Sequence, residues 1–277
     1  MIKRLFFLTG LSLAILSCDE IAPRLNPGGS GNNPNPTDQQ RQVLVEEFTG
    51  VRCVNCPAGS DAIQTLKGIY GDQLIAVSIH SGFFAVPYPE STQDFRTPEG
   101  DNILSYLGEP LGYPTAVINR KLYNGETDLQ LGQSQWAGFI AEETAIAPQA
   151  QITITNTYTA ATRELESKIN FEILENIVED DVRLSVMIVE DGVEDSQLTP
   201  SGKVNNYMHR HVFRDMMTPY DGAPITGPLT AGDLLTRTFN FTLPQGWNTE
   251  HCYVVAFLHH NGAEKSVIQA TEVKVLN

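Results

Sequence analysis

VLVEEFTGVRCVNCP, residues 43–57, joins an apolar segment to a short turn, a Cys-x-x-Cys pair and a proline. Val43–Phe48 is expected to form a β-strand, and Pro57 suits the first turn of a helix. Two cysteines three positions apart can close a small disulfide ring, and the positive end of a helix favours the thiolate of the first, Cys53. The stretch therefore predicts a strand–turn–helix unit with a dithiol site at the start of its helix.

The pattern that follows alternates between strand and helix up to residue 146. Leu74–His80 is almost entirely apolar, as a buried parallel strand is, and Thr97 with Pro98 suits the start of a helix. Residues 42–146 are therefore expected to form an α/β domain. Its predicted elements are the strands Val43–Phe48, Leu74–His80 and Pro114–Asn119 and the helices Pro57–Tyr70, Thr97–Leu107 and Gly132–Thr144.

The periodicity changes after Ala145–Ala150, a short segment of small residues with one proline. Beyond it, apolar and polar residues alternate in short runs that turn residues separate, which is typical of β-strands. Seven such strands predict an all-β, immunoglobulin-like antiparallel sandwich over residues 147–277. The predicted strands are Gln151–Thr155, Ser167–Ile173, Arg183–Val189, Asn206–Arg214, Leu234–Leu243, Cys252–His259 and Val267–Val275.

The N-terminal residues have the form of an export signal. Met1–Arg4 is basic, and Leu5–Leu16 is apolar but too short to span a bilayer. Ile15–Cys18 is similar to the lipobox of bacterial lipoproteins, in which the cysteine is acylated. We expect residues 1–17 to be a lipoprotein signal peptide and Cys18 to carry the lipid. An ordinary signal peptide with a chance cysteine is the alternative.

Residues 18–41 are expected to form the lipidated N-terminus and a flexible linker, because they are rich in proline, glycine and asparagine. Loss of Lys3 and Arg4 with the signal leaves 16 basic residues against 33 acidic ones, a formal charge of −17. Such acidity disfavours nucleic acid and anionic lipid surfaces as partners. Membrane contact is therefore expected through the lipid anchor alone.

Two motifs carry a resemblance to a known fold. CVNC at residues 53–56 resembles the active-site pair of the thioredoxin fold, and Tyr113-Pro114-Thr115 resembles the cis-proline loop that faces it. The likeness implies a thioredoxin-like domain over residues 42–146. Arg52 stands where ordinary thioredoxins have tryptophan, and Val-Asn separates the cysteines, so the direction of electron flow stays open.

Nearly the whole mature chain resembles a family of Bacteroidetes-type lipoproteins, outer membrane protein 28. The motifs that carry the resemblance are EEFTGVRCVNCPAG, GYPTAVINR, YMHRHVFR and VIQATEVKV. The family implies a lipid-anchored protein of the outer membrane, with a thioredoxin-like domain joined to a β-sandwich. Asp19-Glu20 resembles the acidic signal that sends such lipoproteins to the cell surface. A plain linker charge is the alternative, so a periplasmic or a surface-exposed location stays open.

A working site assigns a role to each of four residues. Cys53 is the nucleophile and the more exposed cysteine, and Arg52 beside it favours the thiolate. Cys56 is the resolving thiol that breaks the mixed disulfide. Glu47 occupies the place of the buried acid that takes a proton, and burial is expected to raise its pKa.

The resemblance also implies a substrate groove. A cis bond at Tyr113–Pro114 would leave backbone groups open to an extended client chain, which places Pro114 in the site. Arg52, Tyr113 and Thr115 are then the expected groove residues. An aromatic insertion between residues 81 and 96 either lines the groove or packs into the core, through Phe83, Phe84 and Tyr88.

The cysteine pair admits other roles. The predicted function is thiol–disulfide exchange on exported or surface proteins, with no cofactor. The main alternative is a non-catalytic binding or assembly lipoprotein in which Cys53–Cys56 is a structural disulfide. A metal-binding pair is the third reading, although no second C-x-x-C completes a four-ligand site.

Other chemistry-bearing residues receive plainer predictions. His209 and His211 alternate on one predicted strand and His259-His260 end another; they are expected to be sandwich-rim histidines, a shared metal site being the alternative. Cys252 lies in an apolar strand and is expected to be buried. Three acidic pairs without EF-hand spacing are expected to be solvated turns: Asp180-Asp181, Glu190-Asp191 and Glu194-Asp195.

Overall fold

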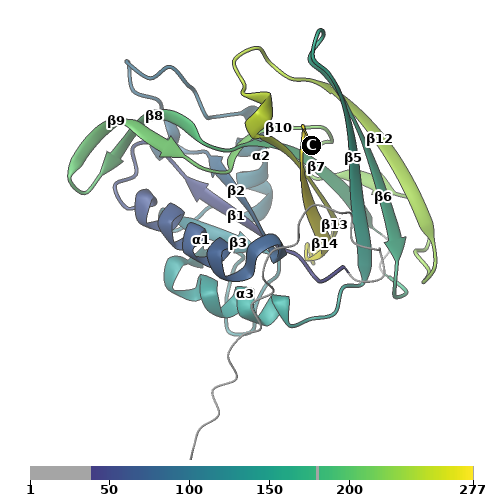
Figure 1. Cartoon of the computed structure of the whole chain (residues 1–277). Coiled ribbons are helices and arrows are strands. Elements are labelled where there is room, and N and C mark those ends of the chain that lie inside the picture. Colours follow the sequence, from purple (N-terminus) through teal and green to yellow (C-terminus); the bar gives the residue numbers. More distant parts are fainter. Residues whose placement is uncertain (1–38, 179–180, 277) are drawn as a thin grey trace, which may run out of the picture. The chain divides into compact units, whose positions relative to one another are not determined.

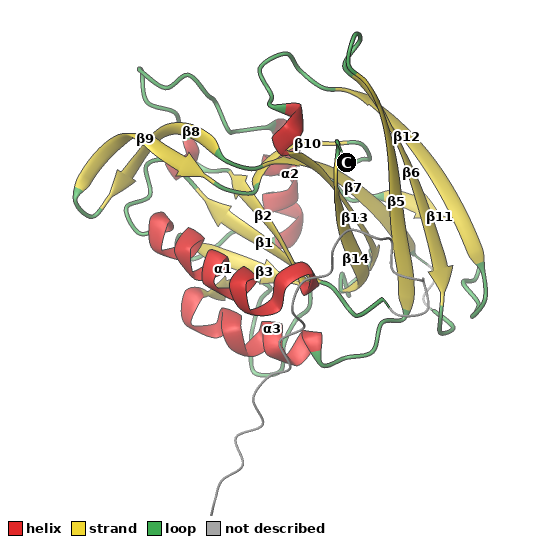
Figure 2. Cartoon of the chain, in the orientation of Figure 1, coloured by secondary structure: helices red, strands yellow, loops and turns green. Residues whose placement is uncertain are grey.

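A computed structural model describes residues 39–178 and 181–276, which lie in one compact unit, Asn33–Asn277. This part of the chain is mostly β, with one mixed sheet, two antiparallel sheets and three α-helices (Figure 1, Figure 2). None of its helices has the length and apolar character needed to span a membrane. The predicted signal peptide, Cys18 and Asp180 lie outside the described residues.

The mixed sheet takes strands from both sides of residue 146. These strands are β1 (Val43–Thr49), β2 (Leu74–His80), β3 (Thr115–Ile118), β4 (Leu131–Gly132), β7 (Val182–Glu190), β10 (Val212–Met216), β11 (Ala223–Ile225), β13 (Cys252–His260) and β14 (Val267–Lys274). Their order is β14-β13-β7-β10-β2-β1-β3-β4, and β11 also pairs with β7. β1 and β10 run parallel to β2, and the other neighbours are antiparallel. The sheet is therefore continuous across the predicted domain boundary.

A second, three-stranded antiparallel sheet lies against the β7–β13–β14 side (Figure 1). It contains β5 (Ala150–Thr159), β6 (Glu164–Ile173) and β12 (Leu234–Thr242). Buried and exposed side chains alternate along β6, which is the pattern of a sheet with one face on the core. Ile152, Phe171, Val186 and Val254 belong to the apolar core that the two sheets share. Burial of this core holds the sheets together.

Helices cover both faces of the strands around β1 (Figure 2). On one face, α1 (Cys56–Tyr70) and α3 (Trp136–Thr144) pack Ile63 and Trp136 against the sheet. On the other face, α2 (Pro98–Leu107) contributes Ile103 to a core that includes Phe48. The hydroxyl of Thr97 accepts a hydrogen bond from the Gly100 N–H at 2.9 Å, so the predicted helix cap is confirmed.

The predicted strand Asn206–Arg214 is wrong, because the chain forms two strands there. β9 (Gly202–His209) pairs with β8 (Val193–Thr199) in a separate two-stranded sheet, whereas β10 belongs to the mixed sheet. The break lies at His211, whose φ is 53°, a left-handed conformation that a strand does not contain. Neither glycine nor proline marks the turn, because residues 206–214 read NYMHRHVFR.

Two of the acidic pairs also depart from the prediction of solvated turns. Glu190 is buried at the end of β7 and forms an ion pair with Arg214 at 2.7 Å. Asp195 is buried within β8. Glu190 is buried because both faces of β7 are covered, and Asp195 alternates with the exposed Glu194 along β8. Hydrogen bonds and ion pairing offset the cost of burying their charge.

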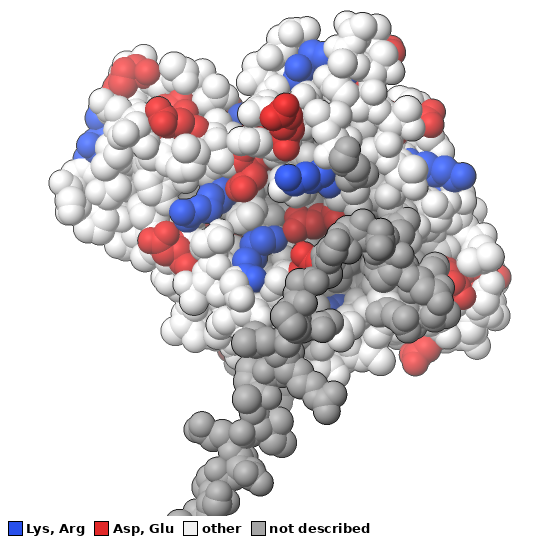
Figure 3. Space-filling view, viewed as in Figure 1, with Lys and Arg blue, Asp and Glu red and all other residues white. Residues whose placement is uncertain are grey.

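The surface shows no large field of one sign on the visible part of the face drawn in Figure 3. Acidic and basic side chains are interspersed there, although the whole chain carries a formal net charge of −15. Ion pairs such as Lys67–Glu272 at 2.9 Å and Arg210–Asp61 at 3.5 Å place opposite charges together. Charge alone therefore does not mark a docking face on this side.

Candidate functional site

Cys53 and Cys56 form a disulfide at the N-terminus of α1. Cys56 is the first residue of the helix and their Cα atoms are 5.4 Å apart. Each cysteine is only 3 % exposed, whereas Val54 and Asn55 between them face solvent. The expectation that Cys53 is the more exposed cysteine is wrong, because other segments of the chain lie against it.

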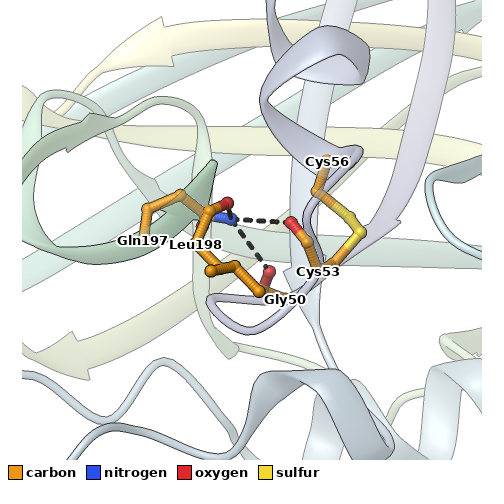
Figure 4. The surroundings of a disulfide bond; sticks show 5 residues. All are labelled: Gly50, Cys53, Cys56, Gln197 and Leu198. Carbon is orange, nitrogen blue, oxygen red and sulfur yellow. Dashed lines mark hydrogen bonds between the residues drawn. A yellow bond between two sulfur atoms is a disulfide. The ribbon is translucent and has the colours of Figure 1, made fainter. Parts of the chain in front are cut away.

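The first of these segments is the β8–β9 hairpin. The side-chain amide Nε2 of Gln197 donates hydrogen bonds to the carbonyl oxygens of Cys53 at 3.0 Å and Gly50 at 3.4 Å (Figure 4). The backbone N–H of Leu198 donates to the carbonyl of Val51 at 2.7 Å. The hairpin thus binds the backbone of the loop that leads into the disulfide.

The second segment is the insertion between residues 81 and 96. Its Phe84 carbonyl accepts a hydrogen bond from the Arg52 N–H at 2.9 Å. A Cβ atom at Gly50 would lie 2.4 Å from the same carbonyl oxygen, so only glycine permits this close approach. Phe84 itself is half-buried, whereas Phe83 is 82 % exposed. The aromatic insertion therefore lies both against the site and at its rim.

The guanidinium of Arg52 is bound to this insertion. It donates hydrogen bonds to the carbonyl oxygens of Val86 and Pro87 at 2.6 and 2.7 Å, and it lies 4.3 Å from the centre of the Tyr88 ring. Arg52 therefore holds the insertion in place. Its effect on the Cys53 thiolate stays a prediction.

Glu47 lies on β1, beneath the first turns of α1. Its carboxyl group is buried, and the Ser78 hydroxyl donates a hydrogen bond to Oε2 at 2.9 Å. Burial raises the pKa of Glu47 to about 8, and the hydrogen bond from Ser78 opposes that rise. A Cβ at Gly59 would lie 2.7 Å from Oε1, so the helix glycine makes room for the carboxyl. A carboxyl that holds its proton near neutral pH thus underlies the helix of the disulfide.

A small cavity connects Cys56 with Glu47 and with the hairpin. Its volume is about 20 Å³, enough for one water molecule. Most of its lining residues have polar side chains, and they come from β1, β2, α1, the hairpin and the residue that follows the hairpin. The lining residues are Glu47, Thr49, Cys56, Pro57, Ser60, Ser78, His80, Gln197, Tyr207, His209 and Arg210. Such a cavity provides polar atoms through which a proton can leave the site.

His80 and His209 are buried imidazoles of this lining. Their ring centres are 5.4 Å apart, and each lies 4.7 Å from the centre of the Phe95 ring. Burial lowers the pKa of His209 to about 4 and that of His80 well below its ordinary value. Both rings are therefore neutral at neutral pH. His80 and the hairpin contacts are not predictable from the sequence, since these residues are far apart in the chain and form no motif.

The other histidines are dispersed. His211 lies in the link after β9, so it does not share a strand with His209 as the alternation predicted. His259 in β13 has its Nε2 2.9 Å from the Ser185 hydroxyl. Within residues 39–178 and 181–276, no three His, Cys, Asp or Glu side chains are placed to bind a metal ion together.

The predicted groove residues take different positions. The Tyr113–Pro114 peptide bond is cis, as the sequence analysis expected. Pro114 contacts α1, because a Cβ at Gly59 would lie 2.8 Å from its ring. Tyr113 is half-buried beside Phe84, and burial raises its pKa. The Thr115 hydroxyl is buried and donates to the Leu131 carbonyl at 2.9 Å, so it faces into the sheet.

Cys252 is the remaining cysteine within the described residues. It is fully buried in β13, as predicted, and burial raises its pKa to about 12. A thiol with this pKa is protonated at neutral pH and is a poor nucleophile. Cys252 is therefore neither exposed to a client nor ionised at neutral pH.

Comparison with known families gives one match. A family model described as outer membrane protein Omp28 matches residues 108–277, which is more than half of the chain. The matched region contains Pro114 and the hairpin but not the cysteine pair. No curated protein sequence matches the chain.

Solved structures share the fold at low sequence identity. HBP35 of Porphyromonas gingivalis is 19 % identical with a TM-score of 0.69, over 85 % of this chain and 76 % of that one. A protein of Agrobacterium tumefaciens is 14 % identical with a TM-score of 0.52, over 86 % of this chain and 96 % of that one. A domain of the outer membrane lipoprotein Omp28 from Porphyromonas gingivalis is 17 % identical with a TM-score of 0.33, over 46 % of this chain and 88 % of that one. The first two likenesses concern the fold alone.

Proposed function

This chain belongs to the Omp28 family of outer membrane proteins, and from that premise we propose that its Cys53–Cys56 pair exchanges thiols and disulfides with exported proteins. One observation carries the proposal. The disulfide lies at the N-terminus of α1, and beneath that helix lies Glu47, a buried carboxyl whose pKa is raised to about 8. The proposed setting is a thioredoxin-like domain over residues 42–146. Acylation of Cys18 would anchor it to the outer membrane, on its periplasmic or its surface side.

The exchange consists of two thiolate attacks. In the reduced protein, the Cys53 thiolate attacks one sulfur of a client disulfide, forms a mixed disulfide and releases the other client sulfur as a thiolate. Cys56 then attacks the sulfur of Cys53, the Cys53–Cys56 bond re-forms and the second client sulfur leaves. Two electrons have passed to the client, whose disulfide is now a dithiol. The reverse sequence oxidises a client dithiol, and the difference in reduction potential sets the direction.

Glu47 supplies the proton transfer that the second attack requires. Cys56 must lose its thiol proton to become a nucleophile, and the carboxylate of Glu47 accepts that proton through the cavity that both residues line. A carboxyl with a pKa of about 8 is matched to a thiol, because the ordinary pKa of cysteine is about 8.5. The site thus contains its own base for the resolving step.

Trapping of the mixed disulfide tests the proposal. In Cys56→Ser the first attack proceeds but the resolving thiol is gone, so covalent adducts with a disulfide-containing test protein should accumulate and disappear on reduction. Cys53→Ser is the matched control, because it removes one thiol from the same pair yet lacks the attacking group. Equal amounts of adduct in the two variants would refute the exchange activity.

A non-catalytic binding or assembly lipoprotein is the second candidate, favoured by the burial of both cysteines. In that case Cys53–Cys56 is a structural bond. The reduction potential separates the two, since structural disulfides have potentials below about −300 mV. A value above that limit is expected for an exchanging pair, and a value below it would favour the binding protein.

A further inference from the structure

The β8–β9 hairpin is attached to the rest of the protein by two short links. It forms its own two-stranded sheet, apart from the mixed sheet that precedes and follows it in the chain. Asp191–Gly192 leads into it and Arg210–His211 leads out, with φ values of 69° at Gly192 and 53° at His211. The links are bound to the sheet at their outer residues, because the His211 carbonyl accepts from the Ser78 N–H at 2.7 Å and the Asp191 N–H donates to the His251 carbonyl at 3.0 Å. Movement of the hairpin would therefore turn about Gly192 and Arg210, the link residues next to β8 and β9.

We propose that the β8–β9 hairpin is a movable cover of the Cys53–Cys56 disulfide, closed in this structure and lifted when a client gains access to Cys53. The inference deepens the proposed exchange function and rests on it for the identity of the client. The lifting of the hairpin itself is a property of the fold. It can be measured without any client.

The contacts of the closed hairpin fall on the cysteine loop. Gln197 donates to the Cys53 carbonyl, and the N–H of Leu198 donates to the Val51 carbonyl at 2.7 Å. Tyr207 and His209 line the cavity beside Cys56. Cys53 is buried in this arrangement. Access of a client sulfur to the buried pair therefore requires the cysteine loop to move, and the hydrogen bonds from the hairpin to that loop oppose the movement.

The hairpin is held by few apolar contacts. Val193 joins a small cluster with Val51, Phe95 and Val212, which is separate from the large cores of the sheets. Most side chains of β9 are at least partly exposed. The other buried side chains of the hairpin are polar: Asp195, Ser196, Gln197 and His209. A segment with so little buried apolar area opens at a lower free-energy cost than the sheets around it.

Asp195 is the principal latch. Its Oδ2 accepts hydrogen bonds from the Gln93 N–H at 2.6 Å, the Thr92 N–H at 2.9 Å and the Thr92 hydroxyl at 3.2 Å. Lys203 and Glu90 add an ion pair between the same two segments. The latch therefore binds the hairpin to the insertion at residues 81–96, whose Phe84 also contacts the cysteine loop.

The rate at which a water-soluble phosphine reduces Cys53–Cys56 in the full mature chain tests the cover. Asp195→Asn weakens three charge-assisted hydrogen bonds, so reduction should be about tenfold faster than in the wild type. Glu194→Gln is the matched control, because it removes the same charge from the neighbouring, exposed position of β8. A rate for Asp195→Asn within twofold of this control would overturn the proposal.

Hydrogen exchange on the unaltered protein gives a second measurement that does not depend on a folded variant. The amides of β8 and β9 should exchange at least tenfold faster than those of β7 and β13, because the hairpin opens while the mixed sheet stays intact. Equal protection of the hairpin and the sheet would overturn the cover. Fast hydrogen exchange of the hairpin and fast reduction of Asp195→Asn, together with no trapped client in Cys56→Ser, would support the cover and refute the thiol–disulfide exchange function.

Discussion

Strand β1 carries two adjacent carboxyl groups, which point to opposite faces of the sheet and have different hydrogen-bond partners there. Glu46 and Glu47 are both buried, at 0 % and 1 % exposure. On one face, the guanidinium of Arg120 donates to both oxygens of Glu46 at 2.6 and 2.8 Å and lies 4.7 Å from the centre of the Phe257 ring. On the other face, Glu47 lies beneath α1 with a single donor, the hydroxyl of Ser78.

The different partners give Glu46 a structural role and leave Glu47 as the carboxyl that can take part in proton transfer. The Glu46–Arg120 pair joins β1 to the end of β3 inside the core and compensates two buried charges. Glu47 forms no ion pair with any residue that the structure describes, and burial raises its pKa to about 8. Equal burial thus comes with different partners: a cation binds Glu46, whereas a hydroxyl binds Glu47, the carboxyl whose pKa burial raises.

Removal of the Arg120–Glu46 ion pair should have the largest effect on stability. Arg120→Met leaves Glu46 as an uncompensated buried charge and should lower the free energy of unfolding by about 3–5 kcal/mol, as measured by urea denaturation. Lys121→Met is the matched control at the next position. Its partners Glu142 and Glu143 lie at the protein surface or keep other donors, so a loss under about 1 kcal/mol is expected. Equal losses in the two variants would show that the buried pair has no special weight.

The contribution of Glu47 to stability should depend on pH. Glu47 binds a proton in the folded but not the unfolded chain between pH 4.5 and about 8, so its contribution to stability is full below pH 4.5 and is lost as pH rises through 8. Glu47→Gln stays neutral. The variant should therefore gain about 3 kcal/mol relative to the wild type between pH 4.5 and pH 7, in urea titrations with the disulfide kept oxidised.

Subtraction of the wild-type curve cancels the contribution of His80 and His209 to the pH dependence of stability. Burial lowers the pKa values of these histidines, so their contribution to stability rises with pH, opposite to that of Glu47. Glu166→Gln, at an exposed position of β6, is the control and should show no such difference. A flat difference curve for Glu47→Gln would mean that Glu47 is ionised in the folded protein, and the contrast between the two faces would fail.

The smallest effect concerns the one hydrogen bond that Glu47 receives. Ser78→Ala should destabilise the protein by about 1.5 kcal/mol above pH 8, where the carboxylate accepts this bond, and by less at pH 5. In a Glu47→Gln background the same substitution should cost less at alkaline pH. A double-mutant cycle measures this coupling. An identical cost in both backgrounds would assign the effect of Ser78 to packing alone.

Local segments of the fold are predictable from the sequence. The predicted strand Leu74–His80 coincides with β2, and the predicted helix Pro57–Tyr70 differs from α1 by one residue. Both follow from periodicity and from proline at the helix start, which act over a few residues. β8 was missed, because DSQ at residues 195–197 has the composition of a turn while its side chains are buried among distant partners.

In the candidate site, too, local features are predictable from the sequence and contacts between distant residues are not. Cys53, Cys56 and Glu47 are recognisable from a strand, a turn and a C-x-x-C spacing, since all three belong to one short stretch of chain. The sequence does not reveal that Gln197, Tyr207 and His209 lie close to that stretch, because Gln197 is 144 residues from Cys53 and the other two are farther along the chain. No periodicity or motif relates residues at that distance.

The sequence by itself determined the strand–turn–helix unit with its cysteine pair, because those features depend on neighbours a few positions apart. The tertiary structure alone decided that Arg120 pairs with Glu46, whereas Glu47 has no ion-pair partner among the described residues, and that the β8–β9 hairpin binds the carbonyl of Cys53. These outcomes depend on which distant groups meet when the chain packs. The free energy of a buried charge is set by those groups and not by its neighbours in sequence.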